Sequence, residues 1–123
     1  MADRRKLVLI VDDDDAVREA LQFALRLEGL HVHVHNGGAA LLADPDLNRA
    51  ACVILDDRMR QMDGFTVLAN LRARNINPPT IMLTSHATPR LRARADAVGV
   101  WNVLEKPLLD DALMDNIRSI LST

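Results

Sequence analysis

Five short apolar runs alternate with stretches of helical spacing along this chain of 123 residues. Each run has four or five residues, mostly β-branched or aliphatic, which is typical of strands in a sheet. Strands and helices that alternate in this way predict a parallel sheet with helices on both faces, joined by right-handed crossovers. We therefore expect a doubly wound α/β fold, with strands at residues 7–11, 31–35, 52–55, 80–84 and 101–104.

Helix start and stop signals fill the intervals between these runs. Asp14 and Asp15 suit a helix N-terminus, where carboxylates accept backbone N–H groups, and Gly29 suits the C-terminal end. Pro89 after Thr88 marks the start of a later helix. No repeat or linker interrupts the pattern, so one domain over residues 1–123 is expected. The expected helices are 17–28, 39–42, 65–74, 89–98 and 109–120.

Composition excludes several classes of function. No apolar run approaches the roughly 20 residues that a membrane helix needs, and residues 1–6 lack the apolar stretch of a secretion signal, so a cytoplasmic protein is expected. Cys52 is the single cysteine and lies in an apolar run, which predicts a buried thiol and no internal disulfide. A net charge of -2 argues against direct binding of nucleic acid.

Polar side chains stand directly after four of the five strands. The carboxyl ends of parallel strands meet at one edge of the sheet, so we expect these side chains to lie together. Crowded carboxylates repel one another, and a hard divalent cation with oxygen ligands, such as Mg²⁺, relieves that repulsion. A lysine and a threonine hydroxyl beside such a cation can bind phosphoryl oxygens, which indicates phosphoryl transfer. The residues are Asp12, Asp13, Asp56, Asp57, Thr84 and Lys106.

These residues, in this order and spacing, resemble the receiver domain of two-component response regulators. The resemblance covers the whole chain, and it implies a five-stranded flavodoxin-like fold with strand order 2-1-3-4-5 and five helices. The matching stretches are residues 7–13, 53–59, 62–64, 81–85 and 105–107.

The resemblance also implies roles for individual residues. Mg²⁺ (or Mn²⁺) would be held by Asp12, Asp13, Asp56 and the backbone carbonyl of Arg58. Asp56 would accept the phosphoryl group, because the family's acceptor precedes a glycine by eight residues and that glycine is Gly64 here.

The remaining positions of the motif follow from the same resemblance. With Asp56 as the acceptor, Asp57 is expected to point away from the site. Thr84 would be the switch hydroxyl, and Lys106 would contact the phosphoryl group. The bond from Lys106 to Pro107 is expected to be cis.

The function implied is a phosphorylation-dependent signalling domain. A histidine kinase or histidine phosphotransfer protein would donate the phosphoryl group, and the domain's own chemistry would be limited to self-directed phosphotransfer and autodephosphorylation. Two alternatives remain open: a degenerate receiver that docks partners without phosphorylation, and a haloacid-dehalogenase-type phosphatase. The order of motifs disfavours the phosphatase, because its paired acidic motif follows the threonine and lysine. A flavin-binding module is disfavoured because four aspartates follow the first strand.

Two positions depart from the family pattern. Arg60 follows Met59 where a proline is usual, and Val103 stands where the family commonly has an aromatic switch residue. Trp101 shares the strand face of Val103 by the period of two, so we hypothesise that its ring takes that role.

The last helices and strand carry the expected partner surface. Arg90, Arg92 and Arg94 lie on the helix at 89–98, next to the strand at 101–104. The resemblance implies that this face, with the last helix, binds partners or supports a homodimer.

Three alternate histidines on the second strand allow two interpretations. His31, His33 and His35 share one face, which suggests zinc. Same-face residues lie roughly 6.6 Å apart along a strand, too far apart for one ion without a further ligand, so an exposed edge-strand face is favoured.

Overall fold

The computed structural model describes residues 5–122 and contains a five-stranded sheet with the order β2-β1-β3-β4-β5. Every neighbouring pair is parallel, which confirms the expected fold class and strand order. The strands are β1 (Leu7–Val11), β2 (His31–His35), β3 (Ala50–Asp56), β4 (Thr80–Thr84) and β5 (Asn102–Glu105). The helices are α1 (Asp15–Leu27), α2 (Gly38–Leu42), α3 (Gly64–Ala73), α4 (Pro89–Ala97) and α5 (Ala112–Leu121), with a 3₁₀ turn at Leu47–Arg49.

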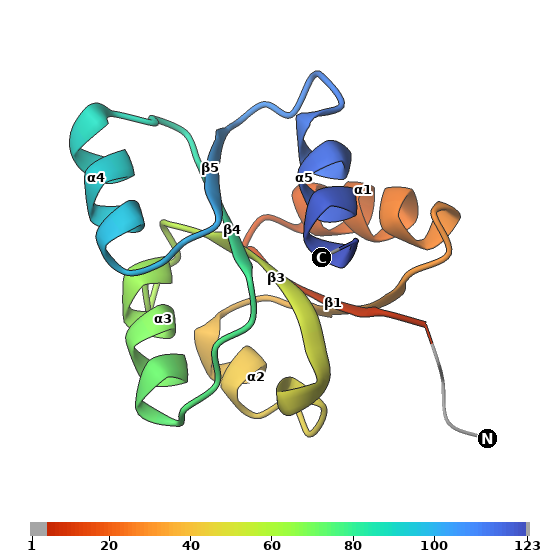
Figure 1. Ribbon diagram of the computed structural model, residues 1–123, viewed down its shortest axis with the longest axis horizontal. Helices are drawn as coiled ribbons and strands as arrows, with labels where there is room; N and C mark the ends of the chain where they lie inside the picture. Colours follow the sequence, from red (N-terminus) through yellow and green to blue (C-terminus); the bar gives the residue numbers. More distant parts are fainter. Residues whose placement is uncertain (1–4, 123) are drawn as a thin grey trace.

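The sheet separates two hydrophobic cores, as its strands alternate between faces. Ile10 and Ile54 face the layer formed by α1 and α5, whereas Leu9 and Leu55 face α2, α3 and α4. Figure 1 shows these helices on the two sides of the strands. β1 and β4 are buried along their whole length, which explains their continuous apolar sequences. This packing fixes the strand ends on which the polar residues stand.

Local sequence signals begin α1 and α4 at the residues that the sequence indicated. The Asp14 carboxylate accepts hydrogen bonds from the N–H groups of Ala16 and Val17, and so caps α1. The Thr88 hydroxyl caps α4 by accepting from Leu91 N–H. Gly29, at φ 83°, adopts the left-handed conformation that ends α1.

The boundaries differ from expectation at several elements. The last helix begins at Ala112 instead of residue 109, because the Asp110 carboxylate binds Ala112 N–H and Leu109 is exposed. β5 begins after Trp101, although Trp101 N–H still donates to the carbonyl of Thr80 at 2.8 Å. β3 is longer than expected at both ends, α2 and α3 begin one residue earlier, and the 3₁₀ turn was not expected.

The interpretation of β2 as an exposed histidine face was wrong. β2 lies at the sheet edge, as expected, but His33 and His35 are partly buried because both rings contact the carboxylate of Asp44. Asp44 follows α2 and was not recognised in the sequence as their partner.

The structure also bears on the Cys52 thiol and on membrane-spanning helices. Cys52 is buried, as predicted, and burial raises the pKa of its thiol to about 12. Among residues 5–122, no helix has the length and apolar content needed to cross a bilayer.

Candidate functional site

Three carboxylates converge at the carboxyl edge of the sheet. Asp12 directly follows β1, Asp13 is the next residue, and Asp56 ends β3. One carboxylate oxygen from each lies within 4.8 Å of the others. Asp12 is 1% exposed and Asp56 5% exposed, while Asp13 is partly open to solvent. Oxygen ligands this close together are suited to a hard divalent cation.

Lys106 supplies positive charge to the same cluster. Its Nζ lies 2.9 Å from Asp12 Oδ2 and 3.3 Å from Asp56 Oδ1. The Lys106–Pro107 peptide bond is cis, as expected, and Lys106 N–H donates to the carbonyl of Thr84 at 2.8 Å. The backbone of β4 therefore anchors the residue whose ammonium joins the ends of β1 and β3.

The site carries more negative charge than one lysine offsets. Burial raises the pKa of Asp56, the neighbouring Asp12 carboxylate raises it further, and Lys106 lowers it, with a net value of about 6. Burial by itself would lower the pKa of Lys106, but its bonds and charge contacts with Asp12 and Asp56 raise it above its ordinary value. Lys106 therefore carries a fixed positive charge. Burial and Asp12 destabilise the ionised form of Asp56, so an additional cation would stabilise that form.

Arg18 supports the cluster from α1 and was not predicted. Its Nη1 donates to the carbonyl oxygen of Asp12 at 2.7 Å, and its Nη2 pairs with Asp15. Asp12 Oδ1 also accepts from Asp14 N–H at 2.9 Å. The helix dipole disfavours an arginine in the first turn of a helix. The position of Arg18 in the sequence therefore could have indicated a specific contact.

Gly64 allows the loop after Asp56 to return to the strand. Gly64 N–H donates to the carbonyl of Asp57 at 3.0 Å. A Cβ at this position would lie 2.6 Å from the carbonyl oxygen of Asp56 and 3.0 Å from Asp57 Cα. The glycine spacing used to choose Asp56 thus has a steric basis, because α3 begins against the backbone of the strand end.

Thr84 and Asp57 form a pair on the other face of the sheet. The Thr84 hydroxyl donates to Asp57 Oδ2 at 3.1 Å, and both residues are buried. Side-chain alternation explains the pairing, because Asp57 and Thr84 come two residues after Leu55 and Met82, which belong to the core beside α2, α3 and α4. Asp57 is outside the three-carboxylate cluster, as expected, but its contact with Thr84 was not foreseen.

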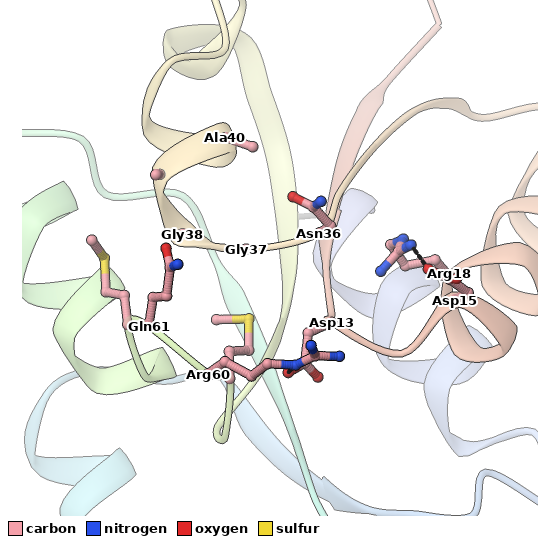
Figure 2. A pocket seen from close by; sticks show the side chains of 12 residues that line it. Asp13, Asp15, Arg18, Asn36, Gly37, Gly38, Ala40, Arg60 and Gln61 are labelled. Atoms are coloured by element: carbon pink, nitrogen blue, oxygen red, sulfur yellow. Dashed lines mark hydrogen bonds and ion pairs between the residues drawn. The ribbon is translucent and has the colours of Figure 1, made fainter.

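A hollow of about 390 Å³ opens beside Asp13. Figure 2 shows the Arg60 side chain extending toward Asp13, with Gly37 and Gly38 on another wall. Arg60 Nε lies 3.7 Å from Asp13 Oδ2, and the arginine is largely exposed. The residue that replaces the usual proline therefore places a second positive charge at the open side of the cluster.

Comparison with known sequences identifies the family. Residues 8–118 match the response regulator receiver domain. The chain belongs to this family. Receiver domains accept phosphate from histidine kinases and bind Mg²⁺ at an acidic pocket. As a family they are regulators in two-component systems, and this membership excludes the phosphatase and flavin interpretations.

Individual relatives agree with this assignment. The receiver domain is 39% identical over 115 residues to the transcriptional regulatory protein FixJ of Azorhizobium caulinodans, covering 93% of this chain and 54% of FixJ. The chain thus spans about half the length of that relative. The structure of Vibrio cholerae CheY4, a chemotaxis protein, has a TM-score of 0.87 at 27% identity, covering 94% of this chain and 98% of CheY4. Thermotoga maritima TrrA, solved with Mg²⁺ and BeF, shares the fold at a TM-score of 0.81 and 24% identity, with 94% and 98% coverage.

Trp101, the aromatic residue proposed for the switch, lies just before β5 and not within it. Trp101 is 46% exposed and lies beside Thr80 at the start of β4, whereas Thr84 ends that strand. Four residues along a strand correspond to about 13 Å, so the backbone of Trp101 lies well away from that of Thr84. Val103, by contrast, is buried against the core beside α4. A switch role for Trp101 stays a hypothesis and would require indirect coupling.

The three arginines of α4 are all exposed, but they do not form one uniform face. Arg92 Nη1 donates to the carbonyl of Val103 at 3.2 Å, and the Arg94 guanidinium lies 3.9 Å from the ring centre of Phe65 on α3. Arg90 is exposed in the first turn. The arginines therefore connect α4 to both of its neighbours.

Proposed function

We propose that this chain, as a single receiver domain over residues 1–123, accepts a phosphoryl group on Asp56. The donor is a histidine kinase or a histidine phosphotransfer protein. The observation that carries the proposal is the convergence of Asp12, Asp13 and Asp56 around Lys106 at the strand ends. The charge imbalance at these carboxylates accounts for a requirement for a divalent cation.

The residues present fit Mg²⁺ (or Mn²⁺). Asp12, Asp13 and Asp56 offer carboxylate oxygens within 4.8 Å of one another, and the backbone carbonyl of Arg58 is the fourth proposed ligand. When bound, the cation neutralises the acidic cluster and the charge on the phosphoryl oxygens.

The protein's own groups position the reacting atoms. A carboxylate oxygen of Asp56 attacks phosphorus, the new O–P bond forms, and the P–N bond to the donor histidine breaks with its electron pair returning to the imidazole. Lys106, already 3.3 Å from Asp56, binds a phosphoryl oxygen and neutralises part of its charge. The same arrangement later directs water to the phosphorus atom, which regenerates Asp56.

An apolar groove beside Lys106 suits the donor. The groove is lined by Lys106, by Val17 and Ala20 of α1, by Leu108, and by Met114 of α5. A helix of the donor protein that packs there would bring its phosphohistidine next to Asp56.

Phosphorylation is read through Thr84. Its hydroxyl donates to Asp57 before phosphorylation, and a phosphoryl group on Asp56 offers it a dianionic acceptor instead. Moving that hydrogen bond shifts the loop from β4 to α4 and changes the α4, β5 and α5 face that carries Arg90, Arg92 and Arg94. Partners or a second copy of the chain bind this face.

The test is phosphorylation by a small phosphodonor in the presence of Mg²⁺, followed by intact mass measurement. Wild type should gain one phosphoryl mass, Asp56→Asn should gain none, and the matched control Asp57→Asn should be labelled. Chelation of Mg²⁺ should abolish the gain. Labelling of Asp56→Asn at the wild-type level would move the acceptor elsewhere. An unlabelled wild type would favour a docking module that acts without phosphorylation.

A further inference from the structure

A second cluster of ligand-type side chains lies at the sheet edge, apart from the phosphorylation site. His33 Nδ1 lies 2.9 Å and His35 Nε2 2.8 Å from the same oxygen, Oδ2 of Asp44. The two histidines project from one face of β2, and Asp44 comes from the loop that follows α2. Two imidazole nitrogens and one carboxylate oxygen thus converge from segments separated by a helix.

Asp44 is held firmly in this position. Its side chain is only 3% exposed, and its second oxygen, Oδ1, accepts from Asp46 N–H at 2.8 Å. Burial raises the pKa of Asp44, but the bonds from Asp46 N–H and the two histidines outweigh this effect and lower it. The carboxylate is therefore charged, oriented by the backbone, and directed at the two rings.

We propose that His33, Asp44 and Asp46 form a binding site for a first-row divalent transition metal, with Zn²⁺ as the representative ion and with His35 as a hydrogen-bonding partner of Asp44. Zn²⁺ takes imidazole nitrogen and carboxylate oxygen as ligands at about 2.0–2.2 Å, which places neighbouring ligand atoms in a tetrahedral site about 3.3 Å apart. The distance of 2.9 Å between His33 Nδ1 and Asp44 Oδ2 therefore needs to lengthen by only about half an ångström to admit the ion.

Asp46 is placed to complete the site. Ligand atoms of His33, Asp44 and Asp46 lie within 4.8 Å of one another. The two carboxylates would balance the charge of a doubly charged ion. An open hollow of about 460 Å³, lined in part by His33, His35 and Asp44, gives the ion access from solvent.

Ligand chemistry distinguishes this site from the acidic pocket. Asp12, Asp13 and Asp56 offer only carboxylate oxygens, which suit Mg²⁺, whereas the β2 site adds imidazole nitrogens, which favour Zn²⁺, Ni²⁺, Co²⁺ or Cu²⁺.

The test is titration of the full, untagged chain with Zn²⁺ by calorimetry, in excess Mg²⁺ to fill the acidic pocket. Wild type should bind one Zn²⁺. His33→Ala and His35→Ala should each weaken binding by at least about tenfold. His86→Ala, which removes a histidine from the β4–α4 loop, and Asp56→Asn should bind like wild type.

A measurement on wild type keeps the proposal testable if a histidine variant does not fold. Co²⁺ should give the visible bands of a tetrahedral site and should broaden the ring resonances of His33 and His35 more than those of His86. Absence of stoichiometric Zn²⁺ binding by wild type would overturn the proposal, and the cluster would then be a hydrogen-bonded structural element. Loss of Zn²⁺ binding in Asp56→Asn, or equal weakening in His86→Ala, would also overturn it.

Discussion

Replacing Asp56 by Asn should stabilise the metal-free protein, because the wild-type carboxylate is ionised at a cost in the folded state. The pKa of Asp56 is about 6 in the fold and 3.8 without the fold's influence. A carboxyl group with a raised folded-state pKa leaves stability unaffected below its unfolded pKa and reduces it as pH rises through the folded pKa. The difference corresponds to a destabilisation of the wild type by about 3 kcal/mol at pH 8 and by roughly half as much at pH 5.

The assay is urea unfolding of both proteins in EDTA at pH 5 and pH 8. Asp56→Asn should have the higher free energy of unfolding at both values, with the larger advantage at pH 8. Mg²⁺ should act in the opposite direction, since at one hundred times its dissociation constant it stabilises a protein that binds it by about 2.7 kcal/mol. Saturating Mg²⁺ should therefore nearly cancel the advantage of the Asn variant.

Two results would refute this reasoning. One is an advantage for Asp56→Asn that does not change between pH 5 and pH 8, since ionisation of Asp56 would then not be its origin. The other is a similar gain from Asp96→Asn, which neutralises an exposed acid on α4 and should leave the free energy of unfolding nearly unchanged. That outcome would attribute the effect to overall charge.

Three further predictions concern the same site. Gly64→Ala places a Cβ 2.6 Å from the Asp56 carbonyl, so it should lower the free energy of unfolding in urea by roughly 1–3 kcal/mol and slow phosphorylation. Lys106→Met should raise the pKa of Asp56 above about 6, and Asp12→Asn should lower it, as read from carboxyl ¹³C shifts; movement in the same direction would contradict the assigned charge effects. Thr84→Ala should be phosphorylated yet show no change in hydrogen exchange of α4, whereas Thr84→Ser should retain the change; equal behaviour of the two variants would exclude the hydroxyl as the switch.

The fold could be predicted from the sequence because apolar runs and turn residues mark each strand locally, and several such signals agree. Three strands, Leu7–Val11, His31–His35 and Thr80–Thr84, have the expected bounds, since apolar runs between turn signals leave little choice of register. The acidic residues and Lys106 were located because parallel strands bring their carboxyl ends to one edge, whatever the details of packing.

The contacts that were missed join residues whose meeting depends on the path of the chain between them. Asp44 reaches His33 and His35 only because α2 turns back along the edge strand, and no spacing rule in the sequence encodes that turn. Asp57 follows β3 and Thr84 ends the adjacent β4, but their hydrogen bond depends on side-chain conformation at these strand ends. The period of two assigns Trp101 a face of the strand and says nothing about its distance from Thr84, so its role as the switch ring stays a prediction.

If Thr84 is the switch hydroxyl, as proposed, its hydrogen bond to Asp57 restrains switching in the unphosphorylated domain. Occasional excursions of an unphosphorylated receiver into its signalling conformation produce output without a stimulus. A buried acceptor makes those excursions rarer, because Thr84 must give up its hydrogen bond to Asp57. An apolar residue at position 57 would lack this restraint. The residue there therefore affects how often the unphosphorylated domain adopts its signalling conformation.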